Sequence, residues 1–126
     1  MVGDRGPARR AGALVRVLVT GATGFVGRHL IAALDAAGIA ARATVRRGSK
    51  PPAGVAEAVP WCAPERPDPS IFEGIDALIH LAAHLPGRYG DPGEASSCLQ
   101  INALGTLELL LAAAAAGIGQ AVCLSS

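Results

Sequence analysis

Three glycines spaced three residues apart are the residues best suited to bind a ligand. Gly21, Gly24 and Gly27 lie in the stretch TGATGFVG, which follows an apolar run at residues 15–20 and opens an amphipathic segment. Gly21 can adopt the positive φ of a tight turn, Gly24 lets the backbone approach a pyrophosphate, and Gly27 lets a helix pack closely on a sheet. Thr23 lies in the same turn, and the free N–H groups of the following helix attract phosphate. This order predicts a dinucleotide site; a structural turn with coincidental glycines is the alternative.

Two arginines at the end of the predicted second strand bear on the choice of dinucleotide. NAD recognition usually requires an acidic residue about 20 residues after the glycines, where it accepts hydrogen bonds from the ribose 2′-hydroxyl. Here the strand ends in Arg46 and Arg47, and no Asp or Glu lies between Asp35 and Glu57. Because arginine binds phosphate well, the sequence predicts NADP in preference to NAD, with Arg46 as the better candidate. The alternative is that both arginines are solvated loop charges.

The pattern of apolar residues predicts alternating strands and helices around these sites. Val26, Leu30 and Leu34 recur at helical spacing in residues 24–37, and residues 76–83 form a continuous apolar run that suits a strand covered on both faces. The other predicted elements are strands at residues 15–20, 39–45, 55–61 and 121–124, and a long apolar helix at residues 95–116 that is expected to be buried. Right-handed crossovers between parallel strands then give an α/β fold, a Rossmann-type doubly wound parallel sheet truncated after about five strands.

The length and composition fit one globular domain without a strongly charged partner. The 126 residues are 51% apolar and carry a net charge of +1. This balance gives no electrostatic case for binding nucleic acid or an anionic membrane, and no apolar run is expected to reach the roughly 18 residues of a membrane helix. Residues 1–14 are polar and rich in Gly and Arg, which predicts a flexible tail before a domain at residues 15–126.

The cysteines and histidines do not suggest a metal site. Cys62, Cys98 and Cys123 lie far apart and form no CxxC pair. Reduced, mostly buried thiols in a cytoplasmic protein are therefore expected. His80 and His84 bracket the end of a predicted strand, where their spacing separates them by about 13 Å. We interpret His80 as a structural residue and predict no metal.

Four segments in chain order resemble a known protein family. They are VLVTGATGFVGRHL at residues 17–30, DALIHLAA at residues 76–83, NALGT from Asn102 and CLSS from Cys123. Together they resemble the extended short-chain dehydrogenase/reductases, in the NAD-dependent epimerase/dehydratase group that acts largely on sugar nucleotides. The resemblance covers about residues 15–126.

The resemblance implies further contacts to the dinucleotide. It places Phe25 and Val26 over the pyrophosphate and Asn102 behind the nicotinamide side of the pocket. The residues implied to line the nicotinamide-side ribose and the nearby phosphate are Leu81, Ala82 and Ala83. Ordinary strand packing is the alternative for each of these small side chains.

One segment departs from the family pattern. The family usually has an Asp near the end of the third strand, where it touches adenine. This chain has Trp61 followed by Cys62, Ala63 and Pro64 in that place. Adenine recognition by a carboxylate is therefore not expected, and Trp61 is a candidate to stack on the base.

The resemblance also implies a catalytic Ser or Thr and a Tyr-x-x-x-Lys pair, in which the Tyr is the acid/base and the Lys lowers its pKa. Ser126 is the best match to the serine. The one tyrosine, Tyr89, is followed four residues later by Gly93, so Lys50 does not complete the motif. We therefore expect a truncated member of the family, inactive alone. Its intact parent would act on a sugar nucleotide or a similar hydroxyl or carbonyl substrate.

Two alternatives stay open at this point. One is a non-catalytic NADP-binding regulatory or interaction protein of the same fold. The other is a flavin-reductase-like relative, which would not need the Tyr/Lys pair but fits the HLAA and NxxGT segments less well. The oligomeric state is not predicted.

Overall fold

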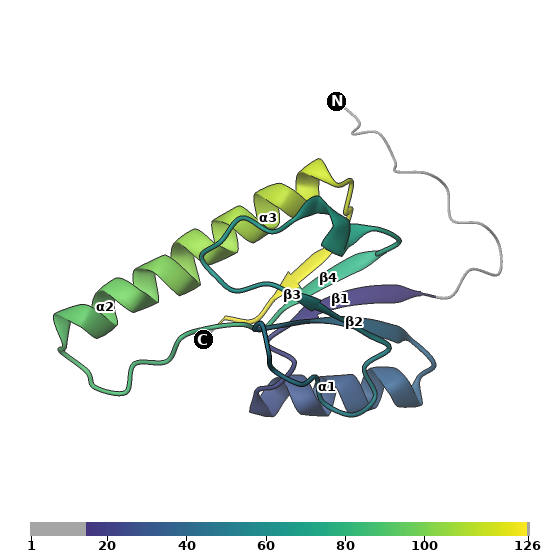
Figure 1. The fold of residues 1–126 in the computed structure, drawn as a ribbon, viewed down its shortest axis with the longest axis horizontal. Helices are drawn as coiled ribbons and strands as arrows, with labels where there is room; N and C mark the ends of the chain where they lie inside the picture. Colours follow the sequence, from purple (N-terminus) through teal and green to yellow (C-terminus); the bar gives the residue numbers. More distant parts are fainter. Residues whose placement is uncertain (1–14, 126) are drawn as a thin grey trace.

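Five parallel strands form one sheet in the computed structural model, which describes residues 15–125 (Figure 1). The strands are β1 (Arg16–Thr20), β2 (Ala40–Val45), β3 (Glu57–Pro60), β4 (Ala77–His80) and β5 (Ala121–Cys123). Their order across the sheet is β3-β2-β1-β4-β5. This order confirms the predicted doubly wound sheet, because the chain turns to one side of β1 for β2 and β3 and to the other side for β4 and β5. The predicted tail at residues 1–14 lies outside the described residues.

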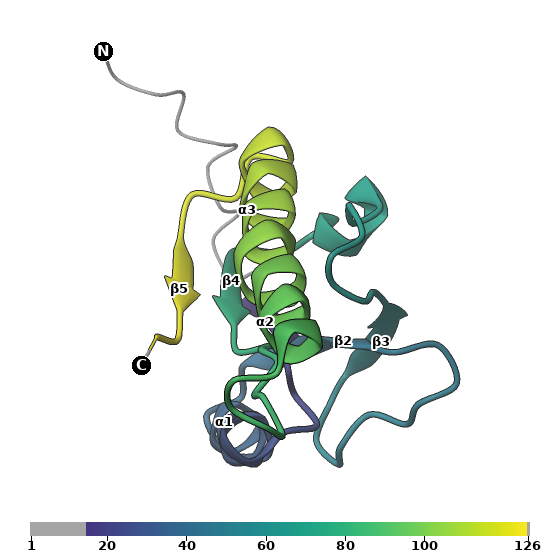
Figure 2. The ribbon, with the colours of Figure 1, turned by 90° about the vertical axis from the view of Figure 1, so that its left-hand side faces the viewer.

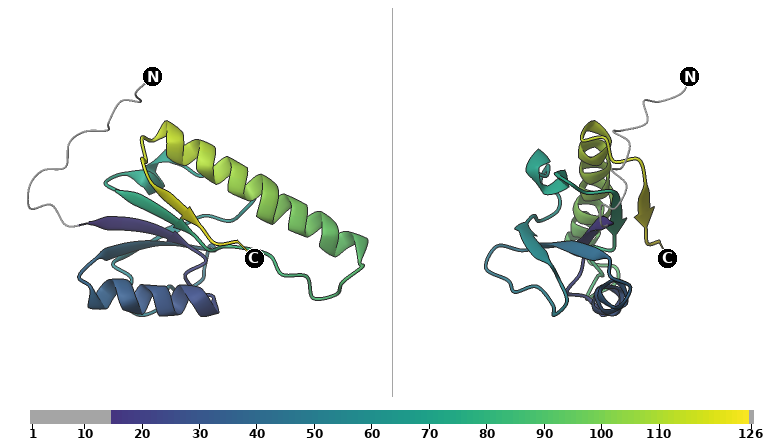
Figure 3. Two further views of the ribbon diagram at one scale, coloured as in Figure 1. Left: turned by 180° about the vertical axis from the view of Figure 1, so that it is seen from behind. Right: turned by 90° about the vertical axis from the view of Figure 1, so that its right-hand side faces the viewer.

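Helices cover both faces of the sheet. Helix α1 (Phe25–Ala36) lies on one face, and a long helix lies on the other (Figures 1 and 3). The long helix consists of α2 (Pro92–Cys98), a π-helical segment η2 (Leu99–Leu104) and α3 (Gly105–Ala115). Figure 2 shows it lying along the sheet beside β4 and β5. A short 3-10 helix, η1 (Pro69–Phe72), precedes β4 and packs near α3.

Side chains that alternate along β1 pack in two separate cores, one on each face of the sheet. Val17 and Val19 join Ile31 and other residues in the core under α1, whereas Leu18 joins Leu109 and others in the core under α3 and η1. Successive side chains of a strand point to opposite faces. A strand that is apolar on both faces, as β1 is, therefore requires a layer of helix on each side.

The buried face of α1 differs from the predicted one. The sequence predicted a face of Val26, Leu30 and Leu34 with Ile31 beside it. Ile31 and Leu34 are buried together with Gly27, and Leu30 is partly buried, but Val26 is 48% exposed. The cause is Gly27, whose missing side chain brings this face of the helix against the β1–α1 turn. The face that follows from that contact passes through Ile31 and not through Val26.

The sequence predicted that the long helix is buried all round, and this prediction is wrong. Its buried residues in α3 are Gly105, Leu109 and Ala113. Four of its leucines are about half exposed or more, namely Leu99, Leu104, Leu107 and Leu111. Only one side of the helix meets the sheet, and no second layer covers the other side in the part of the chain that the structure describes.

The same helix meets the length and hydropathy criteria of a membrane span, which the sequence reading did not expect. The 24 residues of Pro92–Ala115 include an 18-residue window of mean hydropathy 1.5. Length and composition alone are weak evidence, because a helix from the core of a soluble protein passes the same test. Here one face of the helix packs on the second core through Leu109 and Ala113.

Two smaller predictions also change. Strand β4 ends at His80, and residues 81–83 leave the sheet instead of extending it. The cysteines are free but not mostly buried: Cys62 and Cys123 are exposed and Cys98 is half-buried. Cys62 lines a cavity, and Cys123 lies on β5, whose residues are all exposed.

Candidate functional site

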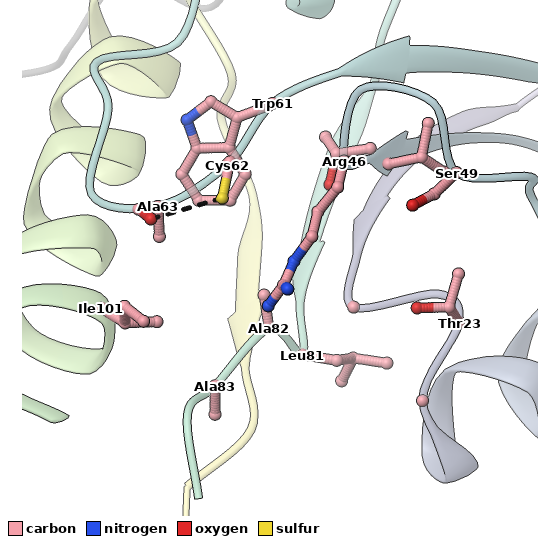
Figure 4. Close-up of a pocket in the computed structure, with 14 residues that line it drawn as sticks. Thr23, Arg46, Ser49, Trp61, Cys62, Ala63, Leu81, Ala82, Ala83 and Ile101 are labelled. Carbon is pink, nitrogen blue, oxygen red and sulfur yellow. Dashed lines mark hydrogen bonds between the residues drawn. The ribbon is translucent and has the colours of Figure 1, made fainter. Parts of the chain in front are cut away.

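A cavity of about 440 Å³ opens at the carboxyl ends of the strands. It is bounded by the β1–α1 turn, the end of β2, the segment after β3, the segment after β4, and Ile101 from the long helix (Figure 4). The cavity straddles β1 and β4, where the chain switches from one side of the sheet to the other. Doubly wound sheets bind their ligands at this switch point.

The glycine turn forms one wall of this cavity, and its geometry matches the predicted roles. Gly21 has φ +72°, and a Cβ placed on it would lie 2.6 Å from the backbone nitrogen of Ala82. A Cβ on Gly27 would lie 2.1 Å from the carbonyl oxygen of Gly21. Gly21 is therefore required both by the turn and by the backbone that passes beside it, and Gly27 by the close approach of α1.

The amino end of α1 opens toward the same cavity without a cap. Gly24 is the N-cap residue, no side chain caps the helix, and its first turn contains no acidic residue. The first N–H groups of an α-helix lack partners within the helix. Because Gly24 also lines the cavity, these groups can bind a phosphate there.

A buried hydrogen-bond network holds the segment after β4 against the turn. The Thr20 hydroxyl accepts hydrogen bonds from the backbone N–H groups of Leu81 and Ala82, both at 3.2 Å. Its own hydrogen is then donated to His80 Nδ1 at 2.5 Å. His80 Nε2 in turn donates to the Thr106 hydroxyl at 2.9 Å. The network fixes where Leu81 and Ala82 meet the cavity.

The same network determines the state of the His80 ring. Because Thr20 already accepts two hydrogen bonds and donates to Nδ1, that nitrogen carries no hydrogen, so the neutral ring has its hydrogen on Nε2, which donates to Thr106. Burial lowers the pKa of His80 below its usual value, because the charged ring would lose its hydration. His80 is thus structural, as the sequence suggested, whereas the roles of Thr20 and Thr106 were missed.

The end of β2 contributes one of the two arginines. Arg46 lines the cavity and points into it, but Arg47 does not line it (Figure 4). Ser49 lies on the same loop and also lines the cavity. None of the described residues that line the cavity is acidic. Among the described residues, the end of β2 therefore presents a cation and no carboxylate to the cavity.

The wall after β3 is formed by Trp61, Cys62 and Ala63. Trp61 is 7% exposed, and its indole N–H donates to the carbonyl oxygen of Glu65 at 2.8 Å. The ring is thus held in the core under α3, with little surface left for stacking. The Cys62 side chain is the more exposed group on this wall, and sequence reasoning assigned it no role.

Several predicted site residues lie away from the cavity. Phe25 is 82% exposed and contacts the His29 ring edge-on, and Val26 is also exposed. Asn102 does not line the cavity either. Ser126, the predicted catalytic serine, lies outside the described residues. The predicted residues that the structure does bring together around the cavity are Gly21, Thr23, Gly24, Arg46, Leu81, Ala82 and Ala83.

Asn102 instead fastens the loop after β4 to the long helix. Its Oδ1 accepts from the backbone N–H of His84 at 2.6 Å, and its Nδ2 donates to the carbonyl oxygen of His84 at 2.9 Å. The His84 ring also pairs with Glu94 at 2.7 Å. Asn102 thus acts on the cavity only indirectly, by holding the segment that leaves it.

Comparison with known proteins identifies close relatives in sequence. The chain is 37% identical over 113 residues to sterol demethylase protein B of Methylococcus capsulatus, covering 86% of this chain and 34% of that protein. It is 41% identical over 115 residues to GDP-6-deoxy-D-mannose reductase of Pseudomonas aeruginosa, covering 81% of this chain and 30% of that protein. The chain therefore spans about a third of the length of the curated relatives it matches.

Solved structures show the same arrangement. MoeE5 in complex with UDP-glucuronic acid and NAD matches with a TM-score of 0.75 and 32% identity, over 88% of this chain and 36% of that one. A tyrosine-to-alanine mutant of uronate dehydrogenase from Agrobacterium tumefaciens, complexed with NAD, matches with a TM-score of 0.65 and 29% identity, over 90% of this chain and 42% of that one. Both neighbours bind NAD. The model of the NAD-dependent epimerase/dehydratase family matches residues 17–126, and the chain belongs to this family.

Proposed function

We propose that this chain is the dinucleotide-binding part of an enzyme that epimerises, dehydrates or reduces a sugar nucleotide or a similar hydroxyl or carbonyl substrate, and that its dinucleotide is NADP(H). The supports are the family, the relatives named for sugar-nucleotide reactions, and the cavity at the switch point of the sheet. A cytoplasmic location, which suits the free cysteines, belongs to the same proposal.

The binding role follows from what surrounds the cavity. The open amino end of α1 and the glycine turn would hold the pyrophosphate through backbone N–H groups. Ala82 and Ala83 line the opposite side, and their small side chains let a ribose approach the backbone. The dinucleotide supplies hydride transfer when bound, and the residues described here would orient it.

The NADP preference is carried by Arg46. Its guanidinium lines the cavity at the end of β2, and none of the described residues around the cavity is a carboxylate that could accept hydrogen bonds from a ribose 2′-hydroxyl. A guanidinium stabilises a 2′-phosphate by charge-assisted hydrogen bonds. Arg47 follows Arg46 in the chain but does not line the cavity.

We infer that these 126 residues bind the dinucleotide but do not turn over substrate. The tyrosine of the chain, Tyr89, is 90% exposed on the loop after β4. Lys50 is the lysine of the chain and lies on the loop after β2. The two groups therefore do not form the pair that would move a proton in this family.

Binding of NADPH and NADH to the purified chain, measured by calorimetry at fixed salt, tests the proposal. We expect NADPH to bind at least tenfold more tightly, because charge-assisted contacts contribute about 1.5–3 kcal/mol. Arg46→Ala should remove most of the difference while leaving NADH affinity within about twofold, and Arg47→Ala is the matched control. Equal or tighter NADH binding would contradict the NADP preference. Binding of neither to a folded chain would contradict the dinucleotide site itself.

A further inference from the structure

The dinucleotide cavity has two chemically different sides. The side formed by the β1–α1 turn, β2 and the loop after β2 carries the hydroxyl and guanidinium groups of Thr23, Thr44, Arg46 and Ser49. The side between the segment after β3 and the long helix is formed by Cys62, Ala63 and Ile101. Figure 4 shows Thr23 and Ser49 across the cavity from Ala63 and Ile101. We call Cys62, Ala63 and Ile101 the apolar slot.

The segment after β3 pairs several of its polar groups with one another. The Trp61 indole N–H donates to the carbonyl oxygen of Glu65 at 2.8 Å, and the Glu65 N–H donates to the carbonyl oxygen of Cys62 at 3.0 Å. The Cys62 thiol donates to the carbonyl oxygen of Ala63 at 3.6 Å. The polar side chain left to meet a ligand in the slot is therefore a thiol, which is only a weak donor and a weak acceptor.

The long helix closes the apolar slot from the other direction. A Cβ placed on Gly105 would lie 2.6 Å from the Cβ of Ala63, so the helix packs directly on the segment after β3. Ile101 lies four residues before Gly105, about one turn away on the same face of the helix, and lines the cavity. The separation of the two walls is therefore set by a glycine and an alanine, neither of which has a side chain that could rotate aside.

The other parts of the dinucleotide determine where its purine would lie. The proposed function puts the pyrophosphate at the amino end of α1 and the adenosine ribose at the end of β2. Strand β3 is the next strand beyond β2 in the sheet, so a base that extends from this ribose away from β1 reaches the segment after β3. It would then lie between that segment and the long helix, in the apolar slot.

We propose that the apolar slot binds the purine ring by its shape and does not recognise the 6-amino group, so that the chain accepts hypoxanthine in place of adenine in its dinucleotide. Adenine presents a donor at its 6-position, whereas hypoxanthine presents a carbonyl acceptor there, as guanine does. Recognition of the donor would need a strong acceptor, and none of the three slot side chains has one. This inference rests on the proposed function and concerns the base, whereas the role of Arg46 concerns the ribose.

The guanidinium of Arg46 does not change this expectation. It has only donors, which can serve N1 of adenine or the 6-carbonyl of hypoxanthine equally well. A site that hydrogen-bonds a ligand group rejects the analogue without that group by about 10⁴-fold or more, whereas an apolar site discriminates weakly between ligands of similar shape. The ratio of the two affinities therefore shows which kind of contact the base makes.

The test compares NADPH with its deamino form, the reduced nicotinamide hypoxanthine dinucleotide phosphate, which differs only at the 6-position and N1 of the purine. Calorimetry measures both affinities for the full chain and for Ile101→Ala, Cys62→Asp and Cys62→Asn. NADH and its deamino form are measured in the same way, so that the result does not depend on the 2′-phosphate. Leu107→Ala is the control for Ile101→Ala, because Leu107 lies on the same long helix, is 52% exposed and does not line the cavity. Circular dichroism confirms that each variant is folded.

We expect the adenine and hypoxanthine forms to bind within about fivefold of each other. Ile101→Ala should weaken both forms about five- to tenfold through the lost apolar contact, and Leu107→Ala should weaken neither. Cys62→Asp should create a preference of at least about tenfold for the adenine form, because a carboxylate accepts a hydrogen bond from the amino group. Cys62→Asn has the same shape as the aspartate, but its amide can serve either base, so it should create no preference.

If the two affinities of the unchanged chain differ by more than about fivefold, the inference is wrong and the proposed function stands. The inference is also wrong if Ile101→Ala leaves both affinities unchanged or Cys62→Asp creates no preference, since the base would then lie elsewhere. If only NADH and its deamino form bind, the NADP preference fails, and their ratio still decides whether the base is recognised. If no form binds to the folded chain, the proposed function fails and the inference fails with it.

Discussion

Replacing Gly21 with Ala, compared with the same change at Gly38, separates two reasons for a glycine in the β1–α1 turn: its positive φ and the backbone that passes close beside it. The residue has φ +72°, and the added Cβ would lie 2.6 Å from the Ala82 nitrogen and 2.7 Å from the Leu81 carbonyl carbon. Both contacts are with backbone atoms, which cannot rotate aside as a side chain could. Gly38, just after α1, provides a matched control, because it has φ +70° and nothing lies within 4 Å of its Cβ position.

The two variants should differ by the free energy of the clash alone. The left-handed conformation costs alanine about 1–2 kcal/mol relative to glycine, and Gly38→Ala should lose only this amount. Gly21→Ala loses it as well and adds about 1–3 kcal/mol for overpacking. The expected loss for Gly21→Ala is thus about 2–5 kcal/mol, a large part of the 5–15 kcal/mol that stabilises a typical domain.

Urea denaturation followed by circular dichroism measures the loss of unfolding free energy in both variants. Titration with NADPH measures whether the cavity still binds the dinucleotide. Gly38→Ala should retain its affinity for NADPH, because it lies at the other end of α1. Gly21→Ala should lose affinity, since Leu81 and Ala82 must move away from the cavity. Equal losses of stability in the two variants would refute the close approach of the turn and the segment after β4. A Gly38→Ala variant as stable as the unchanged chain would refute the backbone part of the reasoning.

Three further predictions test other parts of the site. Burial lowers the pKa of His80, so the unfolded chain binds a proton at this residue before the folded chain does as pH falls below about 6.5. The free energy of unfolding should therefore decrease between pH 6.5 and the lowered pKa. Denaturation at several pH values measures this decrease, which His80→Gln should make smaller. NADPH at ten times its dissociation constant should slow alkylation of Cys62 about tenfold, as mass spectrometry can follow, with the exposed Cys123 as the unprotected control. Asn102→Ala removes both hydrogen bonds to the backbone of His84 at a cost of about 1–3 kcal/mol, so hydrogen exchange at the His84 amide should accelerate about fivefold or more. Unchanged exchange would contradict the role of Asn102 in holding this loop to the long helix.

The fold could be predicted from the sequence because its strongest signals are local. The glycine turn requires particular conformations over a few residues, and both Gly21 and Gly27 have the contacts that the motif implies. The alternation along β1 and the length of the helices then leave few ways to bury apolar side chains on both faces. The strand order follows from these constraints.

The sequence could not show which sides of the helices remain uncovered. Leu107 and Leu111 look like core residues by composition, but they point away from the sheet and are about half exposed. Burial depends on whether a neighbouring layer exists, and the apolar pattern of one helix does not contain that information. The choice between Arg46 and Arg47 did follow from the sequence: Arg46 was the better candidate, and it is the one of the two that lines the cavity.

Three motifs that the sequence presents as separate segments form one physical unit. Thr20 precedes the glycine turn, His80 ends β4 before the HLAA segment turns away, and Thr106 closes the NxxGT segment of the long helix. The hydrogen bonds from Thr20 to His80 and from His80 to Thr106 join all three in the interior. Loss of any one of these three side chains is therefore expected to loosen the hydrogen bonds that join the other two. Thr20, His80 and Thr106 therefore act on the cavity through the backbone that they hold and not by lining it.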